Sequence, residues 1–266
     1  MNSSTYNSVF DDCFHSILSA VESANVSNRP FPHFLFQNIL PESVYFRLLE
    51  TFPPIENYSE LGKYAGTEGQ TRYRCSLTQE GLQGMDSESQ ATWKAVRDAL
   101  GHPTVKAAVF RQLSEGLTYR YSVPRDEVEN VRAYPKTEIY HEKSGYSIKP
   151  HPDTRKKVVT MQIALPADDS QSHLGTEFYR LSPLGLLAKP VGFTKVMTTP
   201  FQPNSGYAFV VLNTKFKRSW HGRSELEENS GERNSLLHLY YGDVENSDHE
   251  VYEKFYAPTP QLKAAA

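Results

Sequence analysis

The sequence predicts a mainly β fold with helical additions, and three observations support this prediction. Of its 266 residues, 38% are hydrophobic and 22% are charged, which suits a soluble globular chain with a core. From about Val131, short runs of β-branched and aromatic residues alternate with turn residues, a pattern typical of a β-sandwich or small barrel. The preceding segment carries apolar residues at helical spacing.

The segment before Val131 is expected to be mostly helical. Helices are predicted over residues 10–24, 41–49, 87–100 (with Ser87 as the N-cap) and 104–113, and short strands over 34–36 and 71–77. Such helices can brace one face of a β core. We therefore expect one integrated domain, with a helical support or lid region at 1–130, a β core at 131–245 and a C-terminal extension at 246–266.

The β core is predicted to contain eight short strands. Their expected ranges are 137–141, 147–150, 157–165, 176–180, 195–198, 207–213, 219–222 and 234–241. Gly, Pro and Asp residues separate these runs, as expected for the turns of an antiparallel fold.

Charge, cysteine content and the N-terminus limit the expected partners and location. The formal net charge is −3, so we expect no nucleic-acid partner bound through bulk positive charge. No apolar run is long enough to span a bilayer, so no membrane partner is expected. Cys13 and Cys75 lack metal-site or redox spacing, and no export signal is apparent. A cytoplasmic protein with reduced thiols is the expectation, and the oligomeric state is left open.

Three side chains in the β core form a candidate metal site. His151 and Asp153 are two residues apart, so on an extended segment they point to the same face. His221 lies on a later predicted strand and completes a set of two histidines and one carboxylate. That set leaves one face of an octahedral metal open, the arrangement typical of non-haem iron(II) oxygenases. Arg233 and Ser235 also share a face, and together they suit a carboxylate of a dicarboxylic acid.

This order of motifs resembles the iron(II)/2-oxoglutarate-dependent dioxygenase superfamily, in particular its small hydroxylase-like members. The resemblance covers about residues 134–242, and it rests on His151-x-Asp153, Trp220-His221-Gly222, Arg233-x-Ser235, Gly145-Tyr146-x-x-x-Pro150 and Leu174-Gly175-Thr176-x-Phe178. It implies a double-stranded β-helix (jelly-roll, cupin-like) core. It also implies Fe(II) bound by His151, Asp153 and His221, with O2 and 2-oxoglutarate as cosubstrates. Arg233 and Ser235 would then bind the far carboxylate of 2-oxoglutarate.

Further residues are candidates for the cosubstrate and substrate sites. Gln162 and Thr176 are expected beside the cosubstrate. The candidates for substrate binding are Arg74, Arg223, Tyr140, His141 and Tyr146. Structural alternatives remain open for all of them, since a solvated edge strand, an ordinary ion pair or rim packing also explains these residue types.

The resemblance implies hydroxylation of an unactivated C–H bond of a small-molecule substrate, anionic or amino-acid-like, with release of succinate and CO2. Two alternatives stay open: a hydroxylase of a peptide or protein side chain, and a non-catalytic cupin-like metal-binding sensor. Desaturation or ring closure remains a possible outcome of the same chemistry. The sequence does not identify the substrate.

Overall fold

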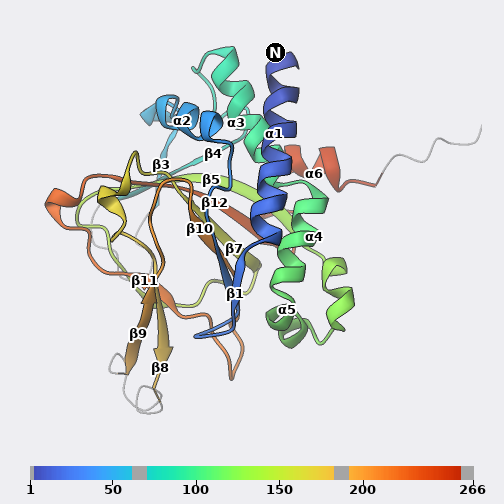
Figure 1. Ribbon diagram of the computed structural model, residues 1–266, viewed down its shortest axis with the longest axis vertical. Helices are drawn as coiled ribbons and strands as arrows, with labels where there is room; N and C mark the ends of the chain where they lie inside the picture. Colours follow the sequence, from blue (N-terminus) through green and yellow to red (C-terminus); the bar gives the residue numbers. More distant parts are fainter. Residues whose placement is uncertain (1–2, 62–70, 183–191, 259–266) are drawn as a thin grey trace, which may run out of the picture.

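Two antiparallel sheets form the centre of the molecule (Figure 1). The computed structural model describes residues 3–61, 71–182 and 192–258. The strands of the larger sheet are β1 (Asn25–Ser27), β2 (His33–Phe36), β3 (Ser59–Glu60), β4 (Arg72–Ser76), β5 (Tyr134–Glu142), β7 (Lys157–Ala164), β10 (Gly206–Val210) and β12 (Arg233–Tyr241). The strands of the smaller sheet are β6 (Ile148–His151), β8 (Glu177–Leu181), β9 (Phe193–Thr198) and β11 (His221–Arg223).

The strand order identifies the core as a double-stranded β-helix. The larger sheet has the order β1-β2-β10-β7-β12-β5-β4-β3, and the smaller has the order β6-β11-β8-β9. From β5 onward the chain passes between the sheets: β5, β7, β10 and β12 lie in the larger sheet, and β6, β8, β9 and β11 lie in the smaller. This alternation is that of a jelly roll. The predicted fold class is confirmed by the chain's own topology.

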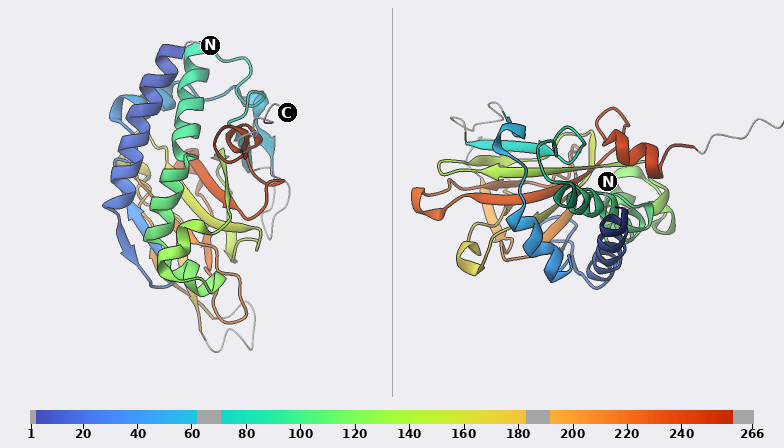
Figure 2. Two further views of the ribbon diagram at one scale, coloured as in Figure 1. Left: turned by 90° about the vertical axis from the view of Figure 1, so that its right-hand side faces the viewer. Right: turned by 90° about the horizontal axis from the view of Figure 1, so that it is seen from above.

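Helices cover the outer face of the larger sheet. The helices of the described residues are α1 (Ser3–Glu22), α2 (Glu42–Glu50), α3 (Ser87–Leu100), α4 (Pro103–Gln112), α5 (Ser114–Tyr121) and α6 (His249–Phe255). Short 3-10 turns occur elsewhere in the chain at η1 (Ile55–Asn57), η2 (Arg125–Asn130), η3 (Asp169–Gln171) and η5 (Glu228–Ser230). Helix α1 lies alongside both α3 and α4, which follow one another along the chain (Figure 2). The Phe110 ring of α4 packs edge-on against Tyr240 of β12, with 5.3 Å between centroids. None of the described helices combines the length and apolar character needed to cross a membrane.

The main core lies between the helices and the larger sheet, so the inner face of that sheet is free to form a polar pocket. Alternation along β12 explains the division. His238 and Tyr240 are buried on the helical side, where His238 is hydrogen bonded to Thr137 (2.9 Å between Nδ1 and Oγ1). Arg233 and Ser235 point to the opposite face. Because the helices pack against the outer face of the larger sheet and form the main core there, the inner face of that sheet can carry polar side chains.

The structure corrects several predicted boundaries. The N-cap of α3 is Asp86 rather than Ser87, because the Asp86 carboxylate accepts hydrogen bonds from the backbone N–H groups of Glu88 and Ser89, both at 2.9 Å. Helix α1 begins at Ser3, well before the predicted start. Strands β1 and β3 and helices α5 and α6 were not predicted. Strands β2 and β4 match the short strands predicted within residues 1–130, and together with β1 and β3 they join the larger sheet.

Candidate active site

The two candidate histidine ligands face each other across neighbouring strands. His151 at the end of β6 is the register partner of His221 at the start of β11. Their ring centroids are 4.5 Å apart. Gly222 permits this close pairing, because a Cβ there would lie 2.7 Å from the carbonyl oxygen of Ile148. The short strands therefore place both imidazoles at one point on the inner face of the smaller sheet.

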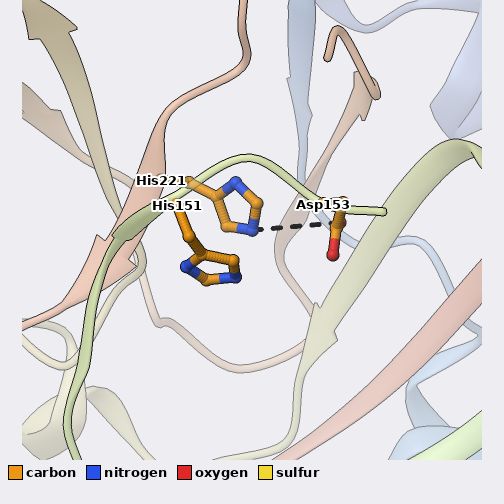
Figure 3. A group of neighbouring side chains, drawn as sticks. All are labelled: His151, Asp153 and His221. Carbon is orange, nitrogen blue, oxygen red and sulfur yellow. Dashed lines mark ion pairs between the residues drawn. The ribbon is translucent and has the colours of Figure 1, made fainter. Parts of the chain in front are cut away.

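Asp153 completes the cluster from the turn after β6. The candidate ligand atoms of His151, Asp153 and His221 all lie within 4.8 Å of one another, and His221 Nε2 is 3.9 Å from Asp153 Oδ2 (Figure 3). Two neighbours orient the carboxylate: Lys157 Nζ donates to Oδ1 and Thr160 Oγ1 donates to Oδ2, both at 2.7 Å. The residues described by the structure contain no other group of three such ligands.

Backbone hydrogen bonds fix which nitrogen of each imidazole is available to a metal. His151 Nδ1 is 2.9 Å from the carbonyl oxygen of Lys149, and His221 Nδ1 is 2.9 Å from that of Ser219. A carbonyl oxygen only accepts, so each Nδ1 carries the proton and each Nε2 presents its lone pair. Metal-bound histidines are commonly oriented in this way.

The charges of the cluster also suit a divalent cation. Burial lowers the pKa of His221 to about 4, with the neighbouring His151 acting in the same direction. Burial likewise lowers the pKa of His151, so both imidazoles are neutral near pH 7. Burial tends to raise the pKa of Asp153, but Lys157 and His221 outweigh it and hold that pKa well below its usual range. Two neutral imidazoles and one carboxylate fit Fe(II) with open coordination positions.

The cluster lies in a small pocket of about 80 Å³ between the two sheets. Gln162, Thr176, Arg233, Tyr140, Tyr146 and Arg223 line it together with the three candidate ligands. A larger cleft of about 360 Å³ lies near Phe216 and Trp220. The described residues that line it include no set of metal-ligating side chains, so we assign the chemistry to the smaller pocket.

A buried guanidinium with several hydroxyl and amide neighbours forms one end of the pocket. Arg233 is 2% exposed. Its Nε donates to the carbonyl oxygen of Leu174 at 2.8 Å. Its Nη2 donates to Gln162 Oε1 at 3.1 Å and to Thr176 Oγ1 at 3.3 Å. Arg233 also donates to Glu142. The Phe201 ring packs against this guanidinium, 4.4 Å from Cζ to the centroid.

The remaining predicted cosubstrate residues join the same network. Gln162 Nε2 donates to Ser235 Oγ at 2.9 Å, and Thr176 Oγ1 donates to Gln162 Oε1 at 3.0 Å. The Tyr207 hydroxyl donates to Thr176 Oγ1 at 2.9 Å. Burial raises the pKa of Tyr207 to about 12, so the phenol remains a neutral donor. A guanidinium surrounded by hydroxyl groups can bind a carboxylate.

The predicted substrate residues separate into two groups. Tyr140, Tyr146 and Arg223 line the pocket. Arg74 and His141 lie outside it, and the structure corrects their expected placement. Arg74 is 41% exposed in its side chain and pairs with Glu138, with 3.5 Å between NH1 and Oε1.

His141 follows Tyr140 on β5, so its side chain points to the other face of the sheet. There its Nδ1 lies 2.7 Å from Asn234 Oδ1, and its ring centroid is 6.2 Å from that of Tyr73.

The pocket residues that were not predicted from the sequence include Arg72, Glu142 and Tyr207. Arg72, the near neighbour of Arg74, reaches the pocket and packs over the rings of Tyr140 and Tyr146. Glu142 is buried beside Arg72 and Arg233. Tyr207 has no local motif and shows only apolar neighbours in sequence. The sequence could have indicated Glu142, because an acidic residue at the end of a largely apolar strand is expected to be buried and therefore to need a charged or hydrogen-bonding partner.

No family model matches the sequence, and no curated protein matches it. Similar solved structures include the non-heme alpha ketoglutarate dependent epimerase SnoN from nogalamycin biosynthesis, at 14% identity over 86% of this chain and 82% of that chain, with a TM-score of 0.47. A Trichoplax adhaerens prolyl hydroxylase bound to a hypoxia inducible factor peptide is 12% identical over 90% of this chain and 91% of that chain, with a TM-score of 0.46. A Pseudomonas putida prolyl-4-hydroxylase is 11% identical over 86% of this chain and 98% of that chain, with a TM-score of 0.44. Because these TM-scores lie below 0.5, the fold assignment stands on the strand order and register of this chain.

Proposed function

We propose that this protein is an iron(II)- and 2-oxoglutarate-dependent oxygenase. The observation that carries the proposal is the cluster of His151, Asp153 and His221, in which both Nε2 atoms and one carboxylate converge. A donor set of this kind leaves coordination positions for a chelating cosubstrate and for O2. A metal without open positions would need a fourth protein ligand, and no further His, Cys, Asp or Glu joins the cluster among the described residues.

The same pocket offers a site for the far carboxylate of 2-oxoglutarate. Arg233 supplies a fixed fork of donors, and Ser235, Thr176 and Tyr207 supply hydroxyl groups around it. When bound, iron and 2-oxoglutarate supply the oxidation of a C–H bond by O2 to an alcohol, with 2-oxoglutarate converted to succinate and CO2. The chain's own residues hold the metal and orient the cosubstrate.

The substrate that we propose is a small anionic or amino-acid-like molecule. Arg223 lines the pocket two residues after His221. Its NH1 donates to the carbonyl oxygens of His173 and Gly175, at 3.3 and 2.9 Å. Among the described residues no carboxylate forms an ion pair with Arg223, so its charge is available to a substrate carboxylate.

The cofactor assignment is tested by adding Fe(II) and 2-oxoglutarate to the protein without oxygen. A weak visible charge-transfer band is expected for the wild type. His151→Ala abolishes it, and His15→Ala, an exposed histidine of α1, leaves it unchanged. Arg233→Lys keeps the charge but loses the fork, so 2-oxoglutarate binds at least about 30-fold more weakly, since a buried charged hydrogen bond contributes about 2 kcal/mol or more. Wild-type protein that is folded and binds iron, yet shows no band, contradicts the proposal.

The substrate class is tested by succinate release from matched compound sets. Amino acids and other carboxylates are compared with their neutral amides in wild-type protein and in Arg223→Gln. The expected result is that a carboxylate substrate stimulates succinate release, and that Arg223→Gln raises KM for it more than for its amide. Stimulation by a peptide with blocked termini, and by no small carboxylate, would instead favour the peptide hydroxylase.

A further inference from the structure

Three charged side chains form a row across the inner face of the larger sheet. Glu142 on β5 is the direct register partner of Arg72 on β4 and of Arg233 on β12. Neighbouring strands lie about 4.8 Å apart, so the backbone itself places one carboxylate between two guanidiniums. All three residues line the pocket that holds the metal cluster.

The carboxylate of Glu142 divides its two oxygens between the two arginines. Oε2 accepts a short hydrogen bond from Arg233 NH1. Oε1 lies 2.9 Å from Arg72 Nε as an ion pair, without a well-aligned hydrogen bond. The Tyr146 hydroxyl also contacts this carboxylate. Glu142 is 1% exposed, so water does not screen these interactions.

Arg233 has little capacity left for a second carboxylate. A guanidinium has five N–H donors, and four of them already donate to an acceptor, which leaves one: the acceptors are Leu174 O, Gln162 Oε1, Thr176 Oγ1 and Glu142. A forked carboxylate contact requires two parallel N–H groups. One of these acceptors must therefore withdraw when a dicarboxylate binds.

Repulsion between carboxylates favours the withdrawal of Glu142 from Arg233, rather than that of Gln162 or Thr176. If Gln162 or Thr176 withdrew, two carboxylates would share one buried guanidinium, and like charges at such a distance repel strongly in a dry site. If Glu142 withdraws, the incoming carboxylate replaces it charge for charge. Arg72 is adjacent, already paired with Oε1 and held over Tyr140 and Tyr146, with 4.5 and 5.1 Å from Cζ to the ring centroids.

We propose that Glu142 occupies the cosubstrate-binding edge of Arg233 in the resting protein, and that binding of 2-oxoglutarate transfers Glu142 to Arg72. This inference rests on the proposed function for the identity of the dicarboxylate. Glu142 is then a built-in competitor that lowers the affinity for 2-oxoglutarate, and Arg72 is the positioning residue that accepts Glu142 when it is displaced. No bond is made or broken in this exchange.

The test measures 2-oxoglutarate affinity in a double-mutant cycle. Fe(II)-loaded wild type, Glu142→Gln, Arg72→Gln and the double variant are titrated without oxygen, and the charge-transfer band reports binding. Glu142→Gln is expected to bind about fivefold or more tightly than the wild type, a typical coupling between two sites. Arg72→Gln binds more weakly, because Glu142 has no second partner, whereas Arg72→Lys stays near the wild type. The double variant behaves like Glu142→Gln.

A second readout needs neither iron nor the keto group. Glutarate carries the two carboxylates of 2-oxoglutarate, and a ligand that binds only the folded state raises Tm. Its Tm increase is expected to be larger in Glu142→Gln than in the wild type. If the wild type gives no charge-transfer band but glutarate behaves in this way, the oxygenase proposal fails and the competitor role stands.

Two results overturn the inference. Weaker binding of both ligands by a folded Glu142→Gln would mean that Glu142 orients Arg233 for the ligand rather than competing with it. Equal binding by the wild type and Arg72→Gln would mean that Arg72 does not receive the carboxylate. Circular dichroism and the ligand-free Tm of each variant establish that the protein titrated is folded.

Discussion

Thr160 is expected to control the affinity of the site for iron without touching the metal. Its Oγ1 donates to Asp153 Oδ2 at 2.7 Å, and this oxygen is the one that faces His221 at 3.9 Å. Thr160 is 4% exposed. Thr160→Val keeps the shape of the side chain and removes only the hydroxyl donor. The Asp153 carboxylate then loses the contact that fixes its rotation before the metal arrives.

The magnitude follows from the kind of bond that is lost. A hydrogen bond to a charged group contributes about 1.5–3 kcal/mol, and loss of an outer-sphere partner typically weakens metal binding about 10- to 100-fold. We therefore expect the Kd for Fe(II) to rise about 10- to 100-fold in Thr160→Val. Lys157 still pairs with Oδ1 at 2.7 Å, so the carboxylate stays charged and the site is not abolished.

Anaerobic calorimetric titration with Fe(II) measures the effect, with Co(II) as an air-stable probe. Thr160→Ser is the matched control, because it removes a methyl group and keeps the donor, and its Kd should remain within about threefold of the wild type, as for a conservative change. The reasoning is refuted if Thr160→Val binds iron as tightly as the wild type. It is also refuted if the Ser variant is as weak as the Val variant, since packing rather than the hydroxyl would then set the affinity.

Three further changes have defined expected outcomes. Tyr207→Phe removes the donor to Thr176 and should weaken 2-oxoglutarate binding several-fold, by about 1 kcal/mol, in the charge-transfer titration. Gly222→Ala places a Cβ 2.7 Å from the carbonyl oxygen of Ile148, so β6 and β11 must separate, and both Tm and iron affinity should fall. Burial lowers the pKa of Lys106 to about 8, below that of the unfolded chain, so the folded state binds fewer protons between about pH 8 and 10.5. The free energy of unfolding of the wild type, relative to that of Lys106→Met, should therefore rise over that window. The expected rise is on the order of 2 kcal/mol, after allowance for solvent at this half-buried side chain. Urea denaturation of both proteins at pH 7.5 and 10.5 measures it.

The β core was predictable because its information is local. Predicted strands at 157–165 and 234–241 correspond to β7 (Lys157–Ala164) and β12 (Arg233–Tyr241) within a residue. Runs of β-branched, aromatic and other apolar residues bounded by turn residues mark such segments. The separation of His151 and Asp153 by one residue likewise predicts a shared direction, and the structure brings their ligand atoms together with that of His221.

The pocket beyond the metal cluster was less predictable, because it depends on register. Arg72 and Arg74 share a face of β4, so alternation cannot choose between them. Register pairs Arg72 with Glu142 inside the pocket, and pairs Arg74 with Tyr140 nearer the edge, where Glu138 takes its charge. A shift of two residues would exchange these roles. His141 was misplaced for a simpler reason, since alternation from Tyr140 already turned it away from the pocket.

The charges of the pocket identify which arginine remains for a substrate. Arg72, Lys157, Arg223 and Arg233 contribute four positive charges, and Glu142 and Asp153 contribute two negative ones. Iron(II) adds two positive charges and 2-oxoglutarate adds two negative ones, so binding both leaves the surplus of two unchanged. Asp153 pairs with Lys157, the cosubstrate carboxylate would pair with Arg233, and Glu142 would then pair with Arg72. Arg223 forms no ion pair among the described residues, and a substrate carboxylate beside it would reduce the surplus of positive charge in the pocket. This balance agrees with the proposal of an anionic group on the substrate, and under that proposal Arg223 rather than Arg72 would bind the group.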